Sequence, residues 1–271
     1  MLNPDRTLAY QIRVPGAVNW VGFATLYRKE VHRFLKVYTQ TLLAPMVVTL
    51  LYLLVFLVAR GKTSSAVLGG LSYGAFLGPG LIMMSVTQNA FANTSSSIMM
   101  NKIQGSIVDI MMPPLSAAEV VIAMALGGVT RGLMVGCVVA IAVLPFVPLH
   151  IVHVLPILYF GFMASLMLSL LGVLAGLWSE KFDHMAAVTN FVVMPLSFLS
   201  GTFYSVDALP SPISSIVRVD PFFYMIDGFR FGFIGFADAP IWIGVVLVAV
   251  LNALLLIWCW LLYASGYKLK A

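Results

Sequence analysis

Five long apolar segments constrain this chain more than any other feature of its sequence. The clearest runs from Ile241 to Ala264 and contains one internal polar residue, Asn252. Crossing about 30 Å of hydrocarbon takes about 20 apolar residues in a helix. Four further segments meet that length, at residues 38–59, 120–144, 155–178 and 185–203. Because the runs are continuously apolar and do not alternate, the sequence predicts an all-α membrane protein whose backbone polar groups are satisfied within helices.

Composition and motifs argue against a catalytic role. The chain is 61% hydrophobic and 9% charged, against about 25% charged residues in soluble domains. Gly61-Lys62-Thr63 resembles the end of a phosphate-binding loop, but Phe56 stands where that motif needs its first glycine. His150 and His153 have no carboxylate or thiolate near them in sequence, which makes a metal site implausible. We therefore expect no catalytic residue, no metal, no cofactor in this chain and no nucleic-acid surface.

The distribution of charge predicts the topology. A sixth, less apolar span at residues 76–99 gives an even number of crossings, so both termini lie on the same side. Ten Lys and Arg then fall on the side of the termini and four on the other, with Arg131 inside a span. Since cytoplasmic loops carry the excess of Lys and Arg, we expect both termini to be cytoplasmic.

An amphipathic segment precedes the first span, within a cytoplasmic region of residues 1–37. Between Asn19 and Tyr38, apolar residues recur at three- and four-residue spacing and predict one apolar helical face. The other face is basic, and its candidate membrane-contacting residues are Arg28, Lys29, Arg33 and Lys36. Such a helix lies in the interface plane beside anionic head groups. The alternative is a cytosolic helix that packs on the bundle.

Polar side chains within the spans are candidates for a transport pathway or for gating. Ser85, Asn89 and Asn93 recur at four-residue spacing along the second span, and Arg131 lies among the glycines of the third. Side chains of this kind at membrane depth face other helices or a water-filled cavity. For Ser85, Asn89 and Asn93, the alternatives are interhelical hydrogen bonding and a transport pathway. For Arg131, they are gating and a structural pairing.

Glycines at four-residue spacing mark close helix packing. They are Gly128, Gly132 and Gly136 in the third span and Gly172 and Gly176 in the fourth. Such rows let helix backbones approach closely, within one chain or between two copies.

Two connecting segments have distinct characters. Residues 100–119 are short and cytoplasmic in the predicted topology, with one or two helical turns before a Pro-Pro pair. Residues 204–239 are apolar but interrupted by prolines and glycines, and their apolar pieces are too short to span. We expect these pieces to form extracytoplasmic re-entrant helices. Within them, Asp227 and Arg230 are further candidates for the pathway or for gating, and their spacing also allows a helix-surface ion pair.

Read in order, these segments resemble the type-2 (ABC-2) family of bacterial ATP-binding cassette (ABC) transporter permeases. The resemblance covers nearly the whole chain and rests on five motifs. They are FLGPGLIMMSVTQNAFANTSSS at residues 76–97, IVDIMMPPLSAAEVVIA at 107–123, GGVTRGLMVG at 127–136, SGTFYSVDALP at 200–210 and DPFFYMIDGFRFGFIG at 220–235.

The resemblance implies an exporter subunit in the bacterial inner membrane. Two copies of the chain would form the translocation path and assemble with two copies of a separate ABC-type ATPase, which holds ATP and Mg²⁺. The loop after the second span resembles the coupling helix that contacts that ATPase, and the amphipathic segment resembles the interface helix beside it. The implied coupling contacts are Gln104, Ile107, Asp109, Ile110 and Met111.

Two other functions compete with this one. A secondary transporter or channel would work without ATP, but that class usually carries several ionisable residues within its spans. Arg131 is the only clear intramembrane charge here. A membrane enzyme or scaffold would need a convergent polar site, which the motifs do not supply. The cargo is not specified by the residues, although 15 methionines and an aromatic outer segment suit a lipid, a glycan carried on lipid or a drug-like amphiphile.

Overall fold

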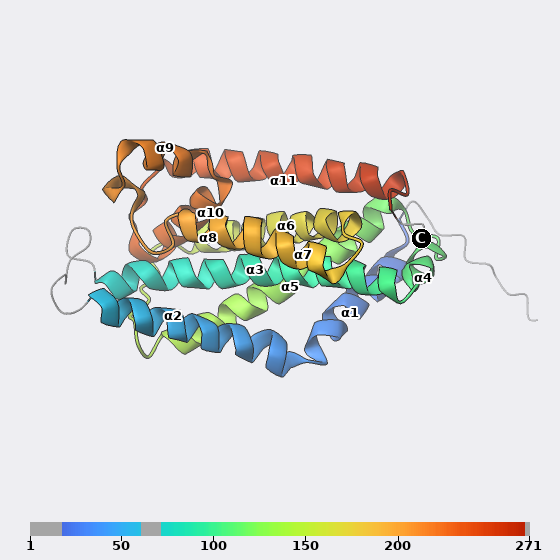
Figure 1. Cartoon of the computed structure of the whole chain (residues 1–271), viewed down its shortest axis with the longest axis horizontal. Coiled ribbons are helices and arrows are strands. Elements are labelled where there is room, and N and C mark those ends of the chain that lie inside the picture. The colour runs from blue at the N-terminus through green and yellow to red at the C-terminus, as the bar shows by residue number, and fades with distance from the viewer. Residues whose placement is uncertain (1–17, 61–71, 269–271) are drawn as a thin grey trace, which may run out of the picture.

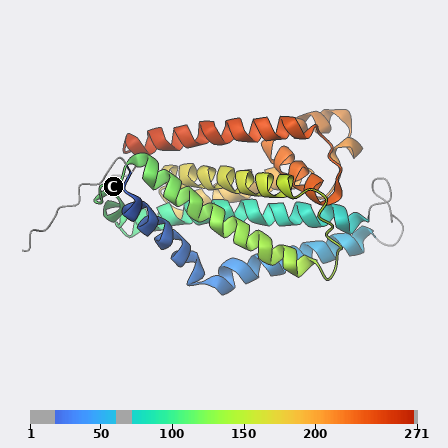
Figure 2. The ribbon, with the colours of Figure 1, turned by 180° about the vertical axis from the view of Figure 1, so that it is seen from behind.

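The computed structural model describes residues 18–60 and 72–268, which form an elongated bundle of helices (Figures 1 and 2). Three parts of the chain lie outside the described residues: residues 1–17 of the predicted interface region, the Gly61-Lys62-Thr63 motif and residues 269–271. The long helices are α1 (Trp20–Leu35), α2 (Ala44–Arg60), α3 (Tyr73–Ile103), α5 (Ala117–Val143), α6 (Val154–Trp178) and α11 (Ile241–Ala264). The shorter ones are α4 (Ile107–Met111), α7 (Phe182–Val188), α8 (Met194–Leu199), α9 (Ser211–Val219) and α10 (Pro221–Ile234).

Five helical segments are long and apolar enough to cross a membrane. They are Thr39–Ala59, Ala117–Val143, Val154–Trp178, Phe182–Leu199 and Ile241–Ala264. Five of the six predicted spans are thereby confirmed as helices of suitable length and composition. The predicted second span, at 76–99, lies within α3, whose 31 residues make it the longest of the described helices. A total of six crossings stays a prediction.

The central position of α3 explains its polar composition. It packs chiefly on α6 and α5, with further contacts to α2 and α10, and it runs through the middle of the bundle (Figure 1). Most of its side chains are buried in the protein. Serines, threonines and asparagines on α3 therefore meet other helices instead of lipid, which makes them tolerable at this depth.

The predicted glycine rows pack against α3 within this chain. A Cβ at Gly132 would lie 2.9 Å from the carbonyl oxygen of Val86, and one at Gly172 would lie 2.5 Å from that of Phe91. Thr94 of α3 also donates to the carbonyl of Ser169 on α6 at 2.7 Å. Close packing of these rows against α3 is thus confirmed.

The predicted span at 185–203 is irregular. It consists of α7, a π-helical turn at Thr189–Val193 and α8, so it begins at Phe182 and ends at Leu199. A second π-helical turn, Thr39–Leu43, precedes α2. Each turn comes just before a proline, Pro195 or Pro45, whose ring would clash with the carbonyl four residues back in a regular helix. Each π-turn therefore lies beside a proline that interrupts the regular hydrogen bonding of the helix.

The segment before the last span folds back on one end of the bundle. It includes a 3₁₀ turn at Val206–Ala208, then α9 and α10, which are 9 and 14 residues long. Both helices are too short to span, as the sequence predicts, and α10 packs on α6, α3 and α11. This end, here called the α9 end, lies opposite the α4 end, where α4 and the last turn of α11 are found (Figure 1). The re-entrant placement of α10 in a membrane stays a prediction.

Candidate functional site

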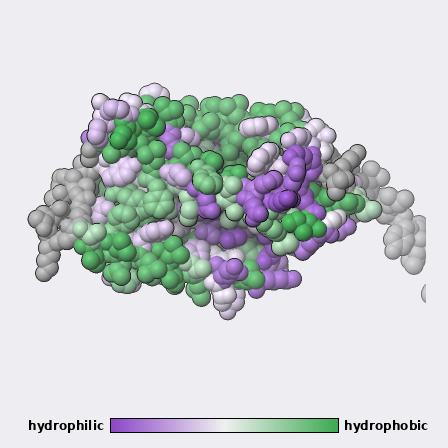
Figure 3. Space-filling view, viewed as in Figure 1, coloured by the Kyte–Doolittle hydropathy of each residue, from purple (hydrophilic) through white to green (hydrophobic). Residues whose placement is uncertain are grey.

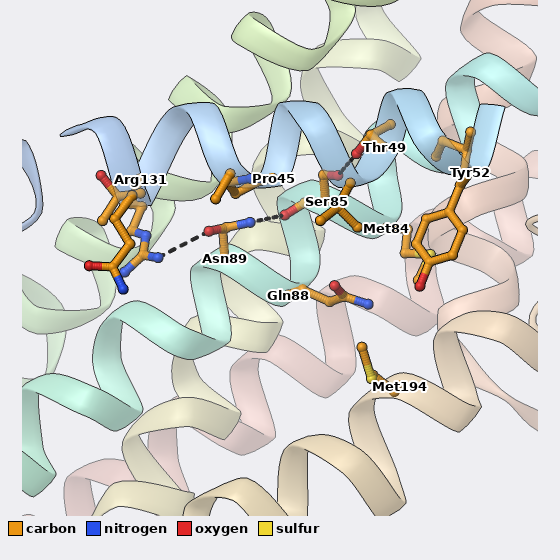
Figure 4. Close-up of a pocket in the computed structure, with 14 residues that line it drawn as sticks. Pro45, Thr49, Tyr52, Met84, Ser85, Gln88, Asn89, Arg131 and Met194 are labelled. Carbon is orange, nitrogen blue, oxygen red and sulfur yellow. Dashed lines mark hydrogen bonds between the residues drawn. The ribbon is translucent and has the colours of Figure 1, made fainter. Parts of the chain in front are cut away.

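A cavity of about 560 Å³ lies between α2, α3, α5 and α8. Figure 4 shows its polar and apolar lining side chains. The residues that line it are Gln40, Thr41, Ala44, Pro45, Val48, Thr49, Tyr52, Leu81, Met84, Ser85, Gln88, Asn89, Arg131 and Met194. The cavity thus brings together three of the predicted pathway residues, namely Ser85, Asn89 and Arg131.

Hydrogen bonds connect the polar residues along one side of this cavity. Arg131 on α5 donates from Nη2 to Asn89 Oδ1 at 3.0 Å. Asn89 Nδ2 donates to the carbonyl of Ser85 at 3.0 Å, and the Ser85 hydroxyl shares a hydrogen bond of 2.7 Å with Thr49 of α2. The chain of contacts therefore joins α5, α3 and α2 (Figure 4).

Asn93, the fourth predicted pathway residue on α3 and α5, belongs to a separate network. Arg33 on α1 donates to the Asn93 carbonyl at 2.6 Å and to its Oδ1 at 3.0 Å. Arg33 also pairs with Glu30 at 3.3 Å, and the fully buried Glu30 accepts from the Ser97 hydroxyl at 2.8 Å. This network fastens α1 to α3, and the sequence interpretation did not include Glu30.

The predicted basic face of α1 is only partly solvent-facing. Arg28, Lys29 and Lys36 are exposed. Arg33 instead bonds to Glu30 and Asn93 and keeps 30% of its side chain exposed, so it also joins α1 to α3. The reason is that a buried carboxylate on the same helix, three residues earlier, supplies a stronger partner than the surface does.

Asp227 and Arg230 lie at the α9 end, away from the cavity, and do not form the predicted surface ion pair. Both are buried. Asp227 accepts hydrogen bonds from the backbone N–H groups of residues 238 and 239, each at 3.0 Å. Arg230 donates to the carbonyl of Gly201 at 2.5 Å and lies 3.7 Å above the ring of Phe76. They fasten the folded-back segment to the bundle and take no part in the cavity.

At the α4 end, the predicted coupling residues divide by exposure. Gln104 and Asp109 are exposed, whereas Ile107 and Ile110 are buried against the bundle. Ile107 and Ile110 therefore anchor α4 and are not presented to a partner. Met111 lies in the helix, but its side chain is not among the described parts.

Two exposed apolar residues on or beside α4 were missed from the sequence. They are Val108 and Met112, with 52% and 78% of their surface exposed. A five-residue helix is shorter than two turns, so its apolar periodicity is too brief to separate buried from exposed positions. Exposed apolar groups beside charged ones are typical of a surface that contacts another protein.

Cationic side chains close the ends of helices around α4. Lys102 Nζ donates to the carbonyls of Gly176 and Ser179 at 3.1 and 2.9 Å, at the C-terminus of α6. Lys268 contacts Glu180 at 2.7 Å. The hydrogen bond between them raises the pKa of Lys268 and lowers the pKa of Glu180. Hydrophilic side chains accordingly gather on this half of the molecule, and hydrophobic ones on the other (Figure 3).

Within the described residues, no group of three or more His, Cys, Asp or Glu is placed to hold a metal ion. The ring of His153 instead stacks on that of Phe231, with 4.9 Å between ring centroids.

The fold and the cavity define a multi-helix membrane protein of the transport class, with a polar cavity among its spans and a short helix at one end. Residues 21–234 match the family model of the ABC-2 type transporter, so the chain belongs to the ABC-2 transporter membrane family. It is 35% identical over 257 residues to the inner membrane transport permease YadH of Escherichia coli K12, covering 93% of this chain and 98% of that protein. It is also 25% identical over 219 residues to nodulation protein J of Rhizobium leguminosarum bv. trifolii, covering 79% and 81%. The resemblance to this family stated from the sequence is confirmed.

Proposed function

We propose that this chain is the membrane permease subunit of an ABC exporter in the bacterial inner membrane. Two copies form the translocation path, and two copies of a separate ATPase drive it. Family membership over residues 21–234 is the observation that carries the proposal. The similarity to a protein named an inner membrane transport permease supports the location.

The surface at α4 supports a contact with the ATPase. Gln104, Val108, Asp109 and Met112 are exposed there, and Ile107 and Ile110 hold the helix on the bundle. A partner that pushes on α4 therefore moves the ends of α3 and α5, which flank it in the chain. ATP-driven closure of the ATPase then biases the bundle between two arrangements through its different affinity for each.

The cavity supports a path shared by two copies. Gln40 and Gln88 line it together with Arg131, and the cavity is partly open at the surface. Figure 3 shows a hydrophilic band between α2 and α3 on this face. Because lipid tails cannot hydrogen-bond such groups, a second copy or water must cover them. We therefore place the second copy against the face that holds the cavity.

Co-purification tests the proposal. The chain purified with its partners should bring down a protein that is labelled by 8-azido-ATP, while the chain alone should hydrolyse no ATP. Val108→Asp should lower the amount of that protein at least about tenfold, since an interface apolar group becomes a desolvated charge. Val219→Asp changes an equally apolar exposed residue at the α9 end and should leave co-purification unchanged.

Two results would contradict the proposal. One is ATP hydrolysis by the chain alone that tracks with it through every purification step. The other is nucleotide-independent transport driven by a proton gradient in vesicles, which would favour a secondary transporter.

A further inference from the structure

Arg131 carries a positive charge that nothing described in this chain neutralises. Its Nη2 donates to an uncharged amide, that of Asn89. Its Nε is buried and has no hydrogen-bond partner among the described residues. The neighbouring charge that acts on it is Arg33, which is also positive. An arginine at mid-span is costly, so one that lacks an anion calls for an explanation.

Among the described residues, a second copy of the chain brings no carboxylate that is placed to be the missing anion. The chain has ten Asp and Glu, and a second copy brings the same ten. Glu30 is fully buried within its own chain and already pairs with Arg33. Except for Asp5, which precedes the described residues, the others lie near helix ends or in the segment between α8 and α11. They are Asp109, Glu119, Glu180, Asp183, Asp207, Asp220, Asp227 and Asp238. None of the described carboxylates therefore lies at the depth of Arg131 in another of the predicted spans.

The other residues that line the cavity indicate which kind of chemical group is attached to the anion. Gln88 lines the cavity and has a buried side-chain N–H group, Nε2, without a partner among the described residues. Away from Arg131, the lining is largely apolar, with Tyr52, Met84 and Met194 (Figure 4). The site thus has a cationic end and an apolar end, with polar donors between them.

We propose that this cavity is an anion subsite for the cargo, in which Arg131 binds the phosphate or carboxylate head group of an amphiphile whose apolar part lies along Tyr52, Met84 and Met194. This inference rests on the proposed function and narrows the cargo to anionic amphiphiles. A guanidinium suits the role because its planar array of N–H donors matches two oxygens of a phosphate or carboxylate.

Binding to the full chain in phosphatidylcholine nanodiscs tests the inference, with nanodiscs lacking protein as the blank. Two probes, dodecyl phosphate and dodecyl maltoside, have the same dodecyl tail and are used below their micelle-forming concentrations. The third probe, inorganic phosphate, has no tail. We expect dodecyl phosphate to bind at least about tenfold more tightly than dodecyl maltoside, the factor that one charge-assisted hydrogen bond supplies. Inorganic phosphate should bind more weakly than dodecyl phosphate, because it lacks the apolar part.

Substitutions assign the preference to Arg131. Arg131→Gln should abolish the preference for dodecyl phosphate, and Arg131→Lys should keep part of it because the charge remains. Arg28→Gln, the same change on the exposed face of α1, should leave it intact. An unchanged preference in Arg131→Gln would overturn the inference, as would inorganic phosphate binding as tightly as dodecyl phosphate. If Arg131→Gln does not fold, Arg131→Lys is measured in its place. An equal fall in its affinity for dodecyl phosphate and for dodecyl maltoside would then overturn the inference.

Transport by the complex with its ATPase separates this inference from the function on which it rests. ATP-driven export whose preference for anionic probes is unaffected by Arg131→Gln would overturn the anion subsite alone. Arg131-dependent binding of dodecyl phosphate without ATP-driven export would overturn the exporter proposal alone.

Discussion

Two arginines in this chain differ in how well the surrounding protein stabilises their positive charge. Arg230 is almost fully buried, yet the Gly201 carbonyl and the Phe76 ring receive its guanidinium. The Nε of each arginine is buried without a partner among the described residues, but the carboxylates of Asp227 and Asp238 act on Arg230, whereas the neighbouring charge that acts on Arg131 is the positive Arg33. An arginine whose charge is compensated, such as Arg230, is typical of a residue that stabilises the fold. An arginine whose charge is not compensated, such as Arg131, is typical of a residue retained for binding although it lowers stability.

The two arginines should therefore respond oppositely to the same change. Arg131→Gln should leave the melting temperature unchanged or raise it, with about 2.5–3.5 kcal/mol as the upper limit of the gain. Arg230→Gln should lower stability by about 1–3 kcal/mol, since the buried Gly201 carbonyl loses its partner. Thermal unfolding of both variants in nanodiscs measures this. A lower melting temperature for Arg131→Gln than for Arg230→Gln would show that Arg131 is structural.

Gly172 tests the close packing of α6 on α3. In Gly172→Ala the new methyl group would lie 2.5 Å from the Phe91 carbonyl oxygen and against the Thr94 hydroxyl. Since a backbone atom cannot rotate away, we expect a loss of about 1–3 kcal/mol in thermal or chemical unfolding. Gly161→Ala, in the same helix, is the control, because its nearest atom would be 3.6 Å away. Equal stability of the two variants would contradict the packing.

At the scale of elements, α1 depends on a small number of side chains for its position. It is fastened to α3 through Arg33 and Glu30, and to α5 through the Tyr27 hydroxyl, which bonds to Thr130 at 2.8 Å. Arg33→Ala removes the cation that joins Glu30 to Asn93 and leaves Glu30 buried without an ion pair. We expect backbone amides of α1 to exchange with solvent at least about fivefold faster. Hydrogen exchange read by mass spectrometry measures this, and Arg28→Ala, at an exposed position, should not change it.

The sequence predicts the long elements well because lipid imposes a length and a composition on them. The last span is predicted at its observed bounds, and α1 is predicted at 19–38 and observed at 20–35. Irregular elements are predicted less well. The segment at 185–203 reads as one apolar run, yet Pro195 introduces a π-turn that hydropathy does not register.

Side-chain partners are predicted less well than helices. Ser85 and Asn89 share a face because of their spacing, and that face does line the cavity with Arg131. Spacing along one helix says nothing about the other helices, so the inward turn of Arg33 could not be read from it. The burial of Ile110 depends equally on neighbours that are remote in sequence.

The whole molecule is polarised, and this polarity predicts its orientation in the membrane. Lys102 and Lys268 bond to carbonyls at the C-terminus of α6, near the α4 end, and Lys181 precedes α7. The basic residues of α1 lie on a helix that runs from this end toward α2 (Figure 1). At the α9 end, Arg218 pairs with Asp207 at 2.9 Å and Arg230 is buried. The α4 end therefore carries the larger share of the Lys and Arg residues, and we expect it to be cytoplasmic.

Single cysteines at the two ends test this orientation in intact cells. The background is Cys137→Ser, because Cys137 is exposed on α5 whereas Cys259 is buried. A membrane-impermeant maleimide should label Ser215→Cys, at an exposed position of α9, in intact cells. It should label Val108→Cys only after the cells are permeabilised, since α4 must face the compartment that holds ATP if it contacts an ATPase. Labelling of Val108→Cys in intact cells would show that α4 faces the outside, opposite to the predicted topology. It would contradict both the proposed contact between α4 and an ATPase and the orientation inferred from the Lys and Arg distribution.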